Sequence, residues 1–599
     1  MKNARFLRVC ISLFAFGFAL TISTAAQNPA EYKERAETEK SWPQRAVRGA
    51  HGMVATDEEL GSRAGLEILQ KGGNAIDAAV ATAFALAVVE PAAGNIGGGG
   101  FMLVRLADGK TSFFDYREVA PGRATRDMYI LPNGKLDPEA STIGYKCVAV
   151  PGTVAGLELV LKTYGTMKLA DVMAPAIRLA DEGFVVSPKL AAELVDERKD
   201  LQRFSVSRRI FLKDGAMYRA GDTLKQPELA ATLKRIAKNG SAEFYRGETA
   251  RMLVDDMARL GGLINMEDLA NYQAKVREPL HAHYELDGHK WDVIAAPPPS
   301  SGGVAVIEAL NMLDGVSLKN WDDPQSVHIM AEVMRRVFAD RAAYLADPDF
   351  AKVPVDGLTS PCYAKELRAT IDAARASSSK TVQAGQPHVC GTEASIASPR
   401  EISSNDGSHT THFSVVDAAG NAVASTYTLN DSYGSHATSS AGFLLNDEMD
   451  DFTTQPGVPN ALFGLIQSEA NAIAPGHRPL SSMTPTILVR DGKLSFVTGS
   501  PGGPRIISAV LLSVVNWMKF GMDAQAAINA PRFHHQWFPD RIVIESQISP
   551  TVQHALEAMG HTTRKVGHIG LVNAIGIDVT SGERLGAADP RDEGSAVGY

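Results

Sequence analysis

Gly407-Ser408-His409-Thr410-Thr411-His412-Phe413-Ser414-Val415-Val416-Asp417 is the point at which a long polar run gives way to an apolar strand. A cut between His409 and Thr410 would give Thr410 a free α-amine beside its hydroxyl. Such an amine titrates near pH ~7.7–8.0, so it can take the hydroxyl proton and activate an otherwise weak nucleophile. Taken alone, the pattern also fits two threonines that simply favour a strand.

A β-hairpin is predicted immediately after Thr410. Two strand-like runs, 413–416 and 422–428, flank a turn signal that contains Gly420. A turn centred near residues 419–420 places Thr410 opposite Leu429 and gives it two diagonal neighbours, Thr428 and Asn430. A slip of one residue would reverse the faces. The hairpin therefore predicts a hydroxyl and an amide beside Thr410.

Composition and charge narrow the class of protein. The chain has 599 residues, of which 45% are hydrophobic and 21% charged, as in ordinary globular proteins. This length allows more than one domain or one large multilayer core. The formal net charge is −9, so the composition gives no indication of a nucleic-acid partner.

Residues 1–26 have the pattern of a secretory signal peptide. The basic residues Lys2, Arg5 and Arg8 precede the apolar run 9–20, and small residues at 24–26 provide a cleavage site. An N-terminal membrane anchor is the alternative, but the apolar run is short for a spanning helix. No later segment has the apolar length of a transmembrane helix. We therefore expect a secreted or periplasmic protein that has no membrane segment after signal removal.

Cysteine and histidine usage gives no indication of a metal site. Cys10 leaves with the signal, and Cys147, Cys362 and Cys390 can form at most one disulfide. The pair His534-His535 has no third ligand at a zinc-like spacing, which favours packing and hydrogen bonding. We expect no cofactor and no metal.

The remaining pattern alternates helices, strands and glycine-rich loops. A buried helix is expected over 74–89, with Asn74 as its N-cap and Asp77 completing a capping box. The loop 94–100 follows a helix and precedes a strand, which is the reverse of the order around a phosphate-binding loop, and it lacks the lysine of such a loop. Its glycines therefore favour close backbone packing. Further expectations are a strand over 101–106, a helical layer over 165–280, helices from 304 and over 325–346, a polar loop over 377–408, a strand over 494–497 and a helix from 505.

Three later clusters carry groups suited to catalysis or binding. Residues 446–451 bring several carboxylates together after an apolar run, and Ser481-Ser482 presents adjacent hydroxyls. Residues 498–503 form a glycine-rich loop between a strand and a helix, where backbone N–H groups can stabilise an oxyanion. Asp450 with Asp451 and Ser481 with Ser482 also fit ordinary polar turns.

Together these motifs resemble the bacterial γ-glutamyltransferases (glutathione hydrolases), over about residues 52–599. The matching segments are 94–101, 115–118, 410–417, 450–452, 479–483, 499–503 and 530–537. The resemblance implies an α+β fold, the four-layer αββα sandwich of the N-terminal nucleophile hydrolases. It also implies self-cleavage between His409 and Thr410 into a large subunit, 27–409, and a small catalytic subunit, 410–599, which stay together as a heterodimer.

The same resemblance assigns residue roles. Thr410 would be the nucleophile, Thr428 its supporting hydroxyl, and Gly502 and Gly503 the oxyanion hole. The α-carboxylate of a γ-glutamyl donor such as glutathione would be held by Arg117, Ser481 and Ser482, and its α-ammonium by Asn430, Glu448 and Asp451. These types suit a zwitterion, because arginine binds carboxylates bidentately and carboxylates bind an ammonium. The γ-glutamyl-enzyme would then pass its acyl group to water, an amino acid or a peptide.

One departure from the family and two alternatives remain. Many bacterial members carry a tyrosine in the lid after the Asp-Asp pair, whereas this chain has Phe463 or Leu462 there. A phenyl ring cannot donate a hydroxyl hydrogen bond, which leaves the balance of hydrolysis and transfer open. One alternative is a related amidase, a β-lactam side-chain acylase or a poly-γ-glutamate-processing enzyme. The other is an uncleaved binding protein with the same fold.

Overall fold

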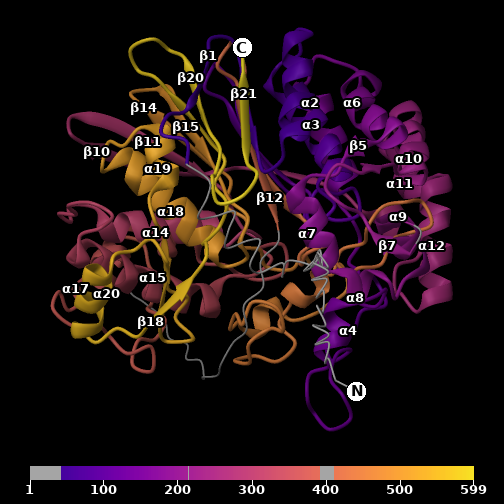
Figure 1. The fold of residues 1–599 in the computed structure, drawn as a ribbon. Helices are drawn as coiled ribbons and strands as arrows, with labels where there is room; N and C mark the ends of the chain where they lie inside the picture. Colours follow the sequence, from indigo (N-terminus) through magenta and orange to yellow (C-terminus); the bar gives the residue numbers. More distant parts are fainter. Residues whose placement is uncertain (1–41, 214, 392–409) are drawn as a thin grey trace, which may run out of the picture. The chain divides into compact units, whose positions relative to one another are not determined.

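The hairpin after Thr410 lies inside a seven-stranded antiparallel sheet in the computed structural model, which describes residues 42–213, 215–391 and 410–599 (Figure 1). The hairpin strands are β12 (Thr411–Val416) and β13 (Ala422–Thr428). The strand order is β21 (Ser595–Gly598), β2 (Met53–Thr56), β12, β13, β3 (Gly99–Arg105), β4 (Thr111–Asp115) and β9 (Lys275–Arg277). The predicted signal, residues 1–26, and the end of the polar loop up to His409 lie outside the described residues.

The observed hairpin register differs by one residue from the prediction. Thr411 pairs with Tyr427, and Val416 pairs with Ala422. Continued by one step, this register puts Thr410 opposite Thr428 and not opposite Leu429. The loop is symmetric about residue 419, because Asp417 and Asn421 close it through backbone and side-chain hydrogen bonds. The predicted neighbour Thr428 is therefore the direct partner of Thr410, whereas the predicted pairing with Leu429 is wrong.

A second seven-stranded antiparallel sheet packs against the first. Its order is β1 (Val47–Gly49), β20 (Arg584–Ala587), β19 (Ala574–Ile577), β15 (Lys493–Thr498), β14 (Thr486–Arg490), β11 (His289–Ala295) and β10 (Leu280–Leu286). Val416 and Ala424 of the first sheet share one hydrophobic core with Ile487 and Val497 of the second. The alternate hairpin residues Phe413 and Val415 belong to a different core. Each hairpin strand therefore packs on both of its faces.

Helices cover both outer faces. The first sheet packs against α2 (Glu59–Gln70), α3 (Ala75–Val89) and α5 (Thr153–Tyr164), with α6 (Leu169–Glu182) behind α3. The second packs against α14 (Gly302–Leu313), α18 (Arg505–Met518) and α19 (Ala524–Asn529), with α15 (Pro324–Tyr344) behind α14. In Figure 1, α2, α3 and α6 lie on one side of β12, and α14, α18 and α19 lie on the other. The predicted four-layer αββα sandwich is confirmed.

The remaining elements fill the periphery of these layers. The helical layer predicted over 165–280 contains α6, α7 (Pro188–Asp196), α8 (Arg198–Leu201), α9 (Ser205–Phe211), α10 (Pro227–Asn239), α11 (Ser241–Arg246), α12 (Glu248–Leu260) and α13 (Met266–Asn271). Others are α4 (Pro138–Thr142), α16 (Val355–Leu358), α17 (Pro361–Ala369), α20 (Pro550–Ala558), η1 (Glu448–Asp451), η2 (Glu469–Asn471), β16 (Phe533–His534), β17 (Ile542–Glu545) and β18 (Thr563–Val566). Two short pairs, β5 (Phe184–Val185) with β8 (Thr223–Leu224) and β6 (Leu212–Lys213) with β7 (Ala216–Met217), complete the described strands.

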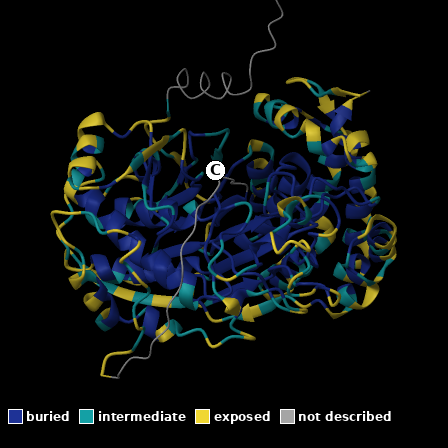
Figure 2. Cartoon of the chain, turned by 90° about the horizontal axis from the view of Figure 1, so that it is seen from below, coloured by how far each residue is buried: buried dark blue, intermediate teal, exposed yellow. Residues whose placement is uncertain are grey.

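The segments before and after the polar loop build one core. Strands β12 and β13, from after the loop, lie between β2 and β3, from before it. The described residues accordingly form one compact unit, and Figure 2 shows its central strands buried. A break in the chain just before Thr410 would leave both parts in the same sheet.

Helix α3 and the glycine loop behave as predicted. Asn74 caps α3 and forms a capping box with Asp77, and every residue of the helix is buried. In the following loop, a Cβ on Gly98 would lie 2.1 Å from the Thr428 carbonyl oxygen. The Asn95 amide donates to that same carbonyl at 2.8 Å. The loop therefore packs its backbone directly on the end of β13, beside Thr410.

One disulfide joins Cys362 of α17 to Cys390, and Cys147 is a buried free thiol. The expectation of at most one pair is confirmed. None of the described helices combines the length and the apolar character that a membrane crossing requires.

Replacement of Asn95 should destabilise the protein. The side chain donates to Ala93 O and Thr428 O and accepts from the Gly98 N–H and the Thr153 hydroxyl, all in a buried site. Asn95→Ala removes these four buried hydrogen bonds, which we expect to cost about 2–4 kcal/mol and to lower Tm in thermal unfolding. Asn133→Ala, in an exposed turn, is the control and should leave Tm unchanged. Equal Tm values for both variants would contradict this assignment.

Candidate active site

One small pocket brings most of the predicted site residues together. Thr410 and Thr428 lie in its wall beside charged, hydroxyl and apolar groups. The full lining is Arg117, Thr410, Thr428, Asn430, Glu448, Asp451, Phe463, Leu465, Ser481, Ser482, Met483, Gly503 and Ile506. Gly502, also predicted, precedes the lining residue Gly503. Segments far apart in the sequence thus converge on the start of β12.

The hydroxyls of Thr410 and Thr428 form the centre of the pocket. Thr410 Oγ1 donates to Thr428 Oγ1 at 3.2 Å, and the Asn430 N–H donates to the same Thr428 oxygen at 2.8 Å. Thr410 is 8% exposed, so its hydroxyl is sheltered while it still lines the pocket. The β-hairpin register fixes the pair, because it places the two residues directly opposite each other.

Arg117 is a buried cation surrounded by carboxylates. It follows β4, and its guanidinium is bound to Glu448 and Asp451 of η1. Nη1 also lies 3.5 Å from Glu118 Oε2, while Nε donates to Pro479 O at 3.1 Å. Glu448 Oε2 is buried and accepts no hydrogen bond from the described residues. The guanidinium therefore faces three carboxyl groups, of which Glu448 and Asp451 line the pocket.

Burial shapes the charges of this group. Burial raises the pKa of Glu448, Asp451 and Glu118, while the Arg117 guanidinium opposes that rise. Burial alone would lower the pKa of Arg117, but Glu448 and Asp451 outweigh it and hold the guanidinium protonated. In a low-dielectric site such charges are stable only when paired, so the guanidinium and the carboxylates stabilise each other.

Ser481 and Ser482 are held by two residues, Ser301 and Arg341, that the sequence did not predict as part of the site. Ser301 donates both its N–H and its hydroxyl to Ser481 O at 2.7 Å. Arg341 of α15 donates to Ser482 Oγ at 3.2 Å and to Ser301 Oγ at 2.9 Å. Burial lowers the pKa of Arg341 to about 10. Arg341 lies inside a long buried helix, and no sequence pattern singled it out.

Asn430 and the glycine pair have unusual backbone conformations. Asn430 has φ 86°, a region that asparagine tolerates better than most residues, and its Nδ2 donates to Asp447 O at 3.2 Å. Gly502 and Gly503 have φ 133° and 54° and lie immediately before α18. A Cβ on Gly503 would lie 2.7 Å from the Phe463 ring. The turn before α18 is thus restricted to glycine and lies against the pocket.

The segment after η1 forms an apolar wall. Phe463 and Leu465 line the pocket and are buried, whereas Leu462, the other residue considered for the lid position, does not line it. Asp450 holds this segment by accepting from the Leu462 N–H at 3.2 Å and from Ser141 Oγ at 2.9 Å. The two adjacent aspartates thus differ: Asp451 lines the pocket and Asp450 anchors the wall.

The histidines near the site are engaged in hydrogen bonds. His412 contacts Thr426 Oγ1 at 2.8 Å, and burial lowers the pKa of its imidazole to about 3. His534 lies 2.7 Å from Ser508 Oγ, and His535 Nδ1 accepts from the Trp537 N–H at 3.1 Å. These contacts agree with the expectation of packing for His534-His535.

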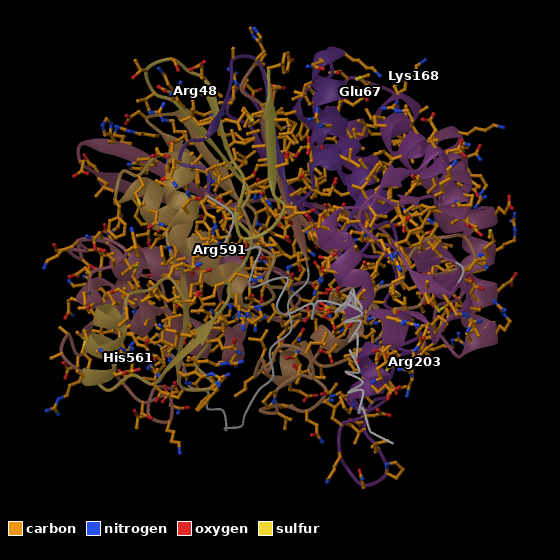
Figure 3. The ribbon with its side chains drawn as sticks, viewed as in Figure 1. Arg48, Glu67, Lys168, Arg203, His561 and Arg591 are labelled. Carbon is orange, nitrogen blue, oxygen red and sulfur yellow. A yellow bond between two sulfur atoms is a disulfide. The ribbon has the colours of Figure 1, made fainter. Side chains whose placement is uncertain are left out.

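A separate buried group, His328, Glu332 and His561, has the residue types of a metal site (His561 is labelled in Figure 3). His328 and His561 are hydrogen bonded to each other at 2.7 Å. Glu332 accepts from Arg335, Arg336 and the Ser377 N–H. Because these donors occupy both carboxylate oxygens, we interpret the group as a structural connection between α15 and its neighbours.

The pocket can perform acyl chemistry on a zwitterionic substrate. It brings together the Thr410 hydroxyl, the supporting Thr428 hydroxyl and the Arg117 guanidinium. It also contains a carboxylate oxygen, Glu448 Oε2, that accepts no hydrogen bond from the described residues. A ligand that carries both a carboxylate and an ammonium can replace the internal pairing of Arg117 with Glu448 and Asp451.

Comparisons with known proteins agree with this geometry. The family model described as Gamma-glutamyltranspeptidase matches residues 61–599. The glutathione hydrolase proenzyme of Escherichia coli (strain K12) is 44% identical over 549 residues, 91% of each chain. The cephalosporin acylase of Bacillus halodurans superposes with a TM-score of 0.79 at 28% identity, covering 94% of this chain and 98% of its own. The gamma-glutamyltranspeptidase of Helicobacter pylori has a TM-score of 0.54 at 41% identity, covering 59% of this chain and 99% of that chain.

Removal of the buried guanidinium should destabilise the fold. Arg117→Met leaves Glu118, Glu448 and Asp451 without their cation, which we expect to cost about 3–5 kcal/mol. Without Arg117 these carboxyls keep pKa values raised by burial, so the added loss of stability grows as pH rises from 5 to 8. Tm measured across this pH range tests the prediction.

Arg126→Met is the matched control, because its ion pair with Glu469 is largely exposed. We expect this pair to contribute less than about 1 kcal/mol. A Tm of Arg117→Met that equals the wild-type value at pH 8 would contradict the prediction.

Proposed function

The chain belongs to the gamma-glutamyltranspeptidase family, and on this basis we propose that it is a γ-glutamyltransferase and glutathione hydrolase. The single observation that carries the proposal is the pocket in which the Thr410 hydroxyl lies beside the paired Arg117, Glu448 and Asp451. A γ-glutamyl donor has an amide at one end and an amino-acid head group at the other, and the pocket offers a complementary group for each.

Maturation would supply the catalytic base. We propose that the precursor cuts itself between His409 and Thr410 into a large subunit, 27–409, and a small subunit, 410–599. The name of the Escherichia coli relative, a proenzyme, supports this, as does the position of Thr410 at the start of a central strand. The new α-amine can then act as general base for the adjacent hydroxyl. Since both parts contribute neighbouring strands, they would remain together as a heterodimer.

The reaction would proceed through an acyl-enzyme. The Thr410 amine accepts the hydroxyl proton while Oγ1 attacks the γ-carbonyl carbon, and the same proton then passes to the leaving amine. Thr428 holds Oγ1 in position, and backbone N–H groups of Gly502 and Gly503 stabilise the oxyanion. Water, an amino acid or a peptide then attacks the γ-glutamyl ester and regenerates Thr410. No step requires a cofactor or a metal.

The donor head group would be recognised by charge. Arg117, Ser481 and Ser482 suit the α-carboxylate, while Asn430, Glu448 and Asp451 suit the α-ammonium. Glu448 Oε2, buried and accepting no hydrogen bond from the described residues, is the group best placed to receive the ammonium. Phe463 closes the wall without a hydroxyl, so we assign it shielding and not substrate hydrogen bonding.

Secretion to an oxidising compartment, such as the periplasm, fits the same proposal. The signal-like residues 1–26 indicate export, and the Cys362–Cys390 disulfide is of the kind that persists outside a reducing cytoplasm.

A second candidate is an acylase that removes dicarboxylate side chains, favoured by the structural similarity to the cephalosporin acylase. A glutaryl group has no α-ammonium, so it would leave Glu448 and Asp451 facing an uncharged methylene group. The carboxylates therefore favour the γ-glutamyl donor. An uncleaved binding protein is the weaker alternative, because it needs no hydroxyl pair in the pocket.

A donor panel tests the proposal. We expect γ-glutamyl-p-nitroanilide to be cleaved with a kcat/KM at least ~100-fold above that of glutaryl-p-nitroanilide, because two charge-assisted contacts to the ammonium contribute about 3 kcal/mol. Glu448→Gln should narrow this ratio by weakening the ammonium site selectively. Faster turnover of the glutaryl substrate by the wild-type enzyme would support the acylase instead.

A further inference from the structure

Two buried carboxyl groups meet at the hydroxyl of Thr411, the residue after the proposed nucleophile. Thr411 Oγ1 lies 2.9 Å from Asp57 Oδ2 and 3.1 Å from Glu90 Oε2. Asp57 follows β2, and Glu90 is the C-terminal cap of α3. Thr411 is completely buried, and both acids are nearly so. The end of β2 and the end of α3 therefore place two acids directly behind the start of β12.

Counting protons limits how these three groups can bond. A threonine hydroxyl has one hydrogen and can donate to only one of the two carboxyl oxygens. The second short O···O contact is a hydrogen bond only when the other carboxyl carries a proton and donates to Thr411 Oγ1. Two ionised carboxylates would instead face one buried oxygen from both sides, which is costly in a low-dielectric site.

The surrounding donors indicate which acid carries the proton. Asp57 accepts the His412 N–H at 3.3 Å and the Asn573 side-chain amide, which suits an ionised carboxylate. The cation nearest to Glu90 among the described residues is Lys189, whose Nζ lies 3.6 Å from the Glu90 carboxyl group. The same ammonium lies closer to Asp592, at 2.9 Å. Burial raises the pKa of both carboxyl groups, which favours retention of one proton by the pair. The donors to Asp57 favour ionised Asp57 and protonated Glu90.

Other charged and titratable groups around the pair come from several elements. They are Glu58 beside α2, Lys189 and Glu193 of α7, Asp592 near the C-terminus, and the phenols of Tyr427 and Tyr433. The three acids Glu58, Glu193 and Asp592 surround the single ammonium of Lys189. This excess of acids over cations disfavours a second negative charge on the Asp57–Glu90 pair.

We propose that Asp57 and Glu90 hold one proton between them and, through the Thr411 hydroxyl, act as positioning residues for Thr410. This inference rests on the proposed function. With Glu90 donating to Thr411 and Thr411 donating to Asp57, the first two residues of β12 are fixed by side-chain and backbone bonds. The fixed start of β12 holds Thr410 Oγ1 at 3.2 Å from Thr428 Oγ1. Loss of the shared proton breaks one link and loosens the nucleophile.

The two acids should respond oppositely to amide substitution. In Glu90→Gln the amide N–H replaces the carboxyl O–H as donor at every pH, so we expect kcat within about 2-fold of wild type at pH 7. In Asp57→Asn an amide replaces the ionised acceptor, and we expect kcat to fall at least ~10-fold with KM little changed. Thr411→Ser should retain the link and Thr411→Val should lose it, which provides a matched pair that leaves both acids in place.

The experiment measures kcat for γ-glutamyl-p-nitroanilide between pH 6 and 9.5, per mole of matured protein. The ratio of Glu90→Gln to wild type should rise with pH, because only wild type loses the Glu90 proton, whereas substrate and Thr410 amine titrations are common to both. A ratio that stays flat, or equal losses in Glu90→Gln and Asp57→Asn, would overturn the inference.

Thermal unfolding gives a second readout that is independent of activity. The pKa of Glu90 is raised from its usual 4.5 to about 8, so wild-type stability falls as pH rises between these values, and Glu90→Gln should lack this part of the fall. Identical Tm slopes for the two proteins contradict the shared proton. Wild-type protein that leaves the anilide intact counts against the proposed function alone, and the Tm slopes then still decide the proton arrangement.

Discussion

The antiparallel pairing of β12 with β13 is the constraint on which the rest of the site depends. It places Thr410 opposite Thr428, and their hydroxyls meet at 3.2 Å. Because the hairpin lies between β2 and β3, with helices on one side and a second sheet on the other, it cannot shift without disturbing both cores. The same position keeps the strand in place if the chain is cut just before Thr410. A reactive chain end can thus be created in a rigid environment.

Buried charge is the second theme of the structure. On the pocket side, Arg117 neutralises carboxylates that would otherwise be unstable, and a zwitterionic ligand can take over this pairing. On the other side of the strand, Asp57 and Glu90 meet at Thr411, and the Lys189 ammonium near Glu90 lies closer to Asp592. A ligand can replace the partners of Arg117, whereas Asp57 and Glu90 keep their contacts with Thr411. Recognition and positioning are therefore separated on the two faces of one strand.

Several features of the fold and of the site could be predicted from the sequence because they depend on local patterns. The Asn74 cap, the hairpin and the glycine turn at 502–503 follow from neighbouring residues. The register was missed by one residue, because the turn sequence fits two loop centres and only the closing bonds of Asp417 and Asn421 distinguish them. Arg341, Asp57 and Glu90 were missed for another reason. Their partners are distant in sequence, and an isolated charged residue has no periodic signal.

The most direct test of the account is the intact mass and N-terminal sequence of the purified protein, compared with Thr410→Ala prepared in the same way. The account predicts that the wild-type chain is recovered as two polypeptides, one of which comprises residues 410–599 and begins Thr410-Thr411-His412. Thr410→Ala should remain a single chain, because it lacks the hydroxyl that starts the cut. An uncut and stable wild-type chain, or an equally cut Thr410→Ala chain, would contradict the central claim that Thr410 generates its own catalytic amine.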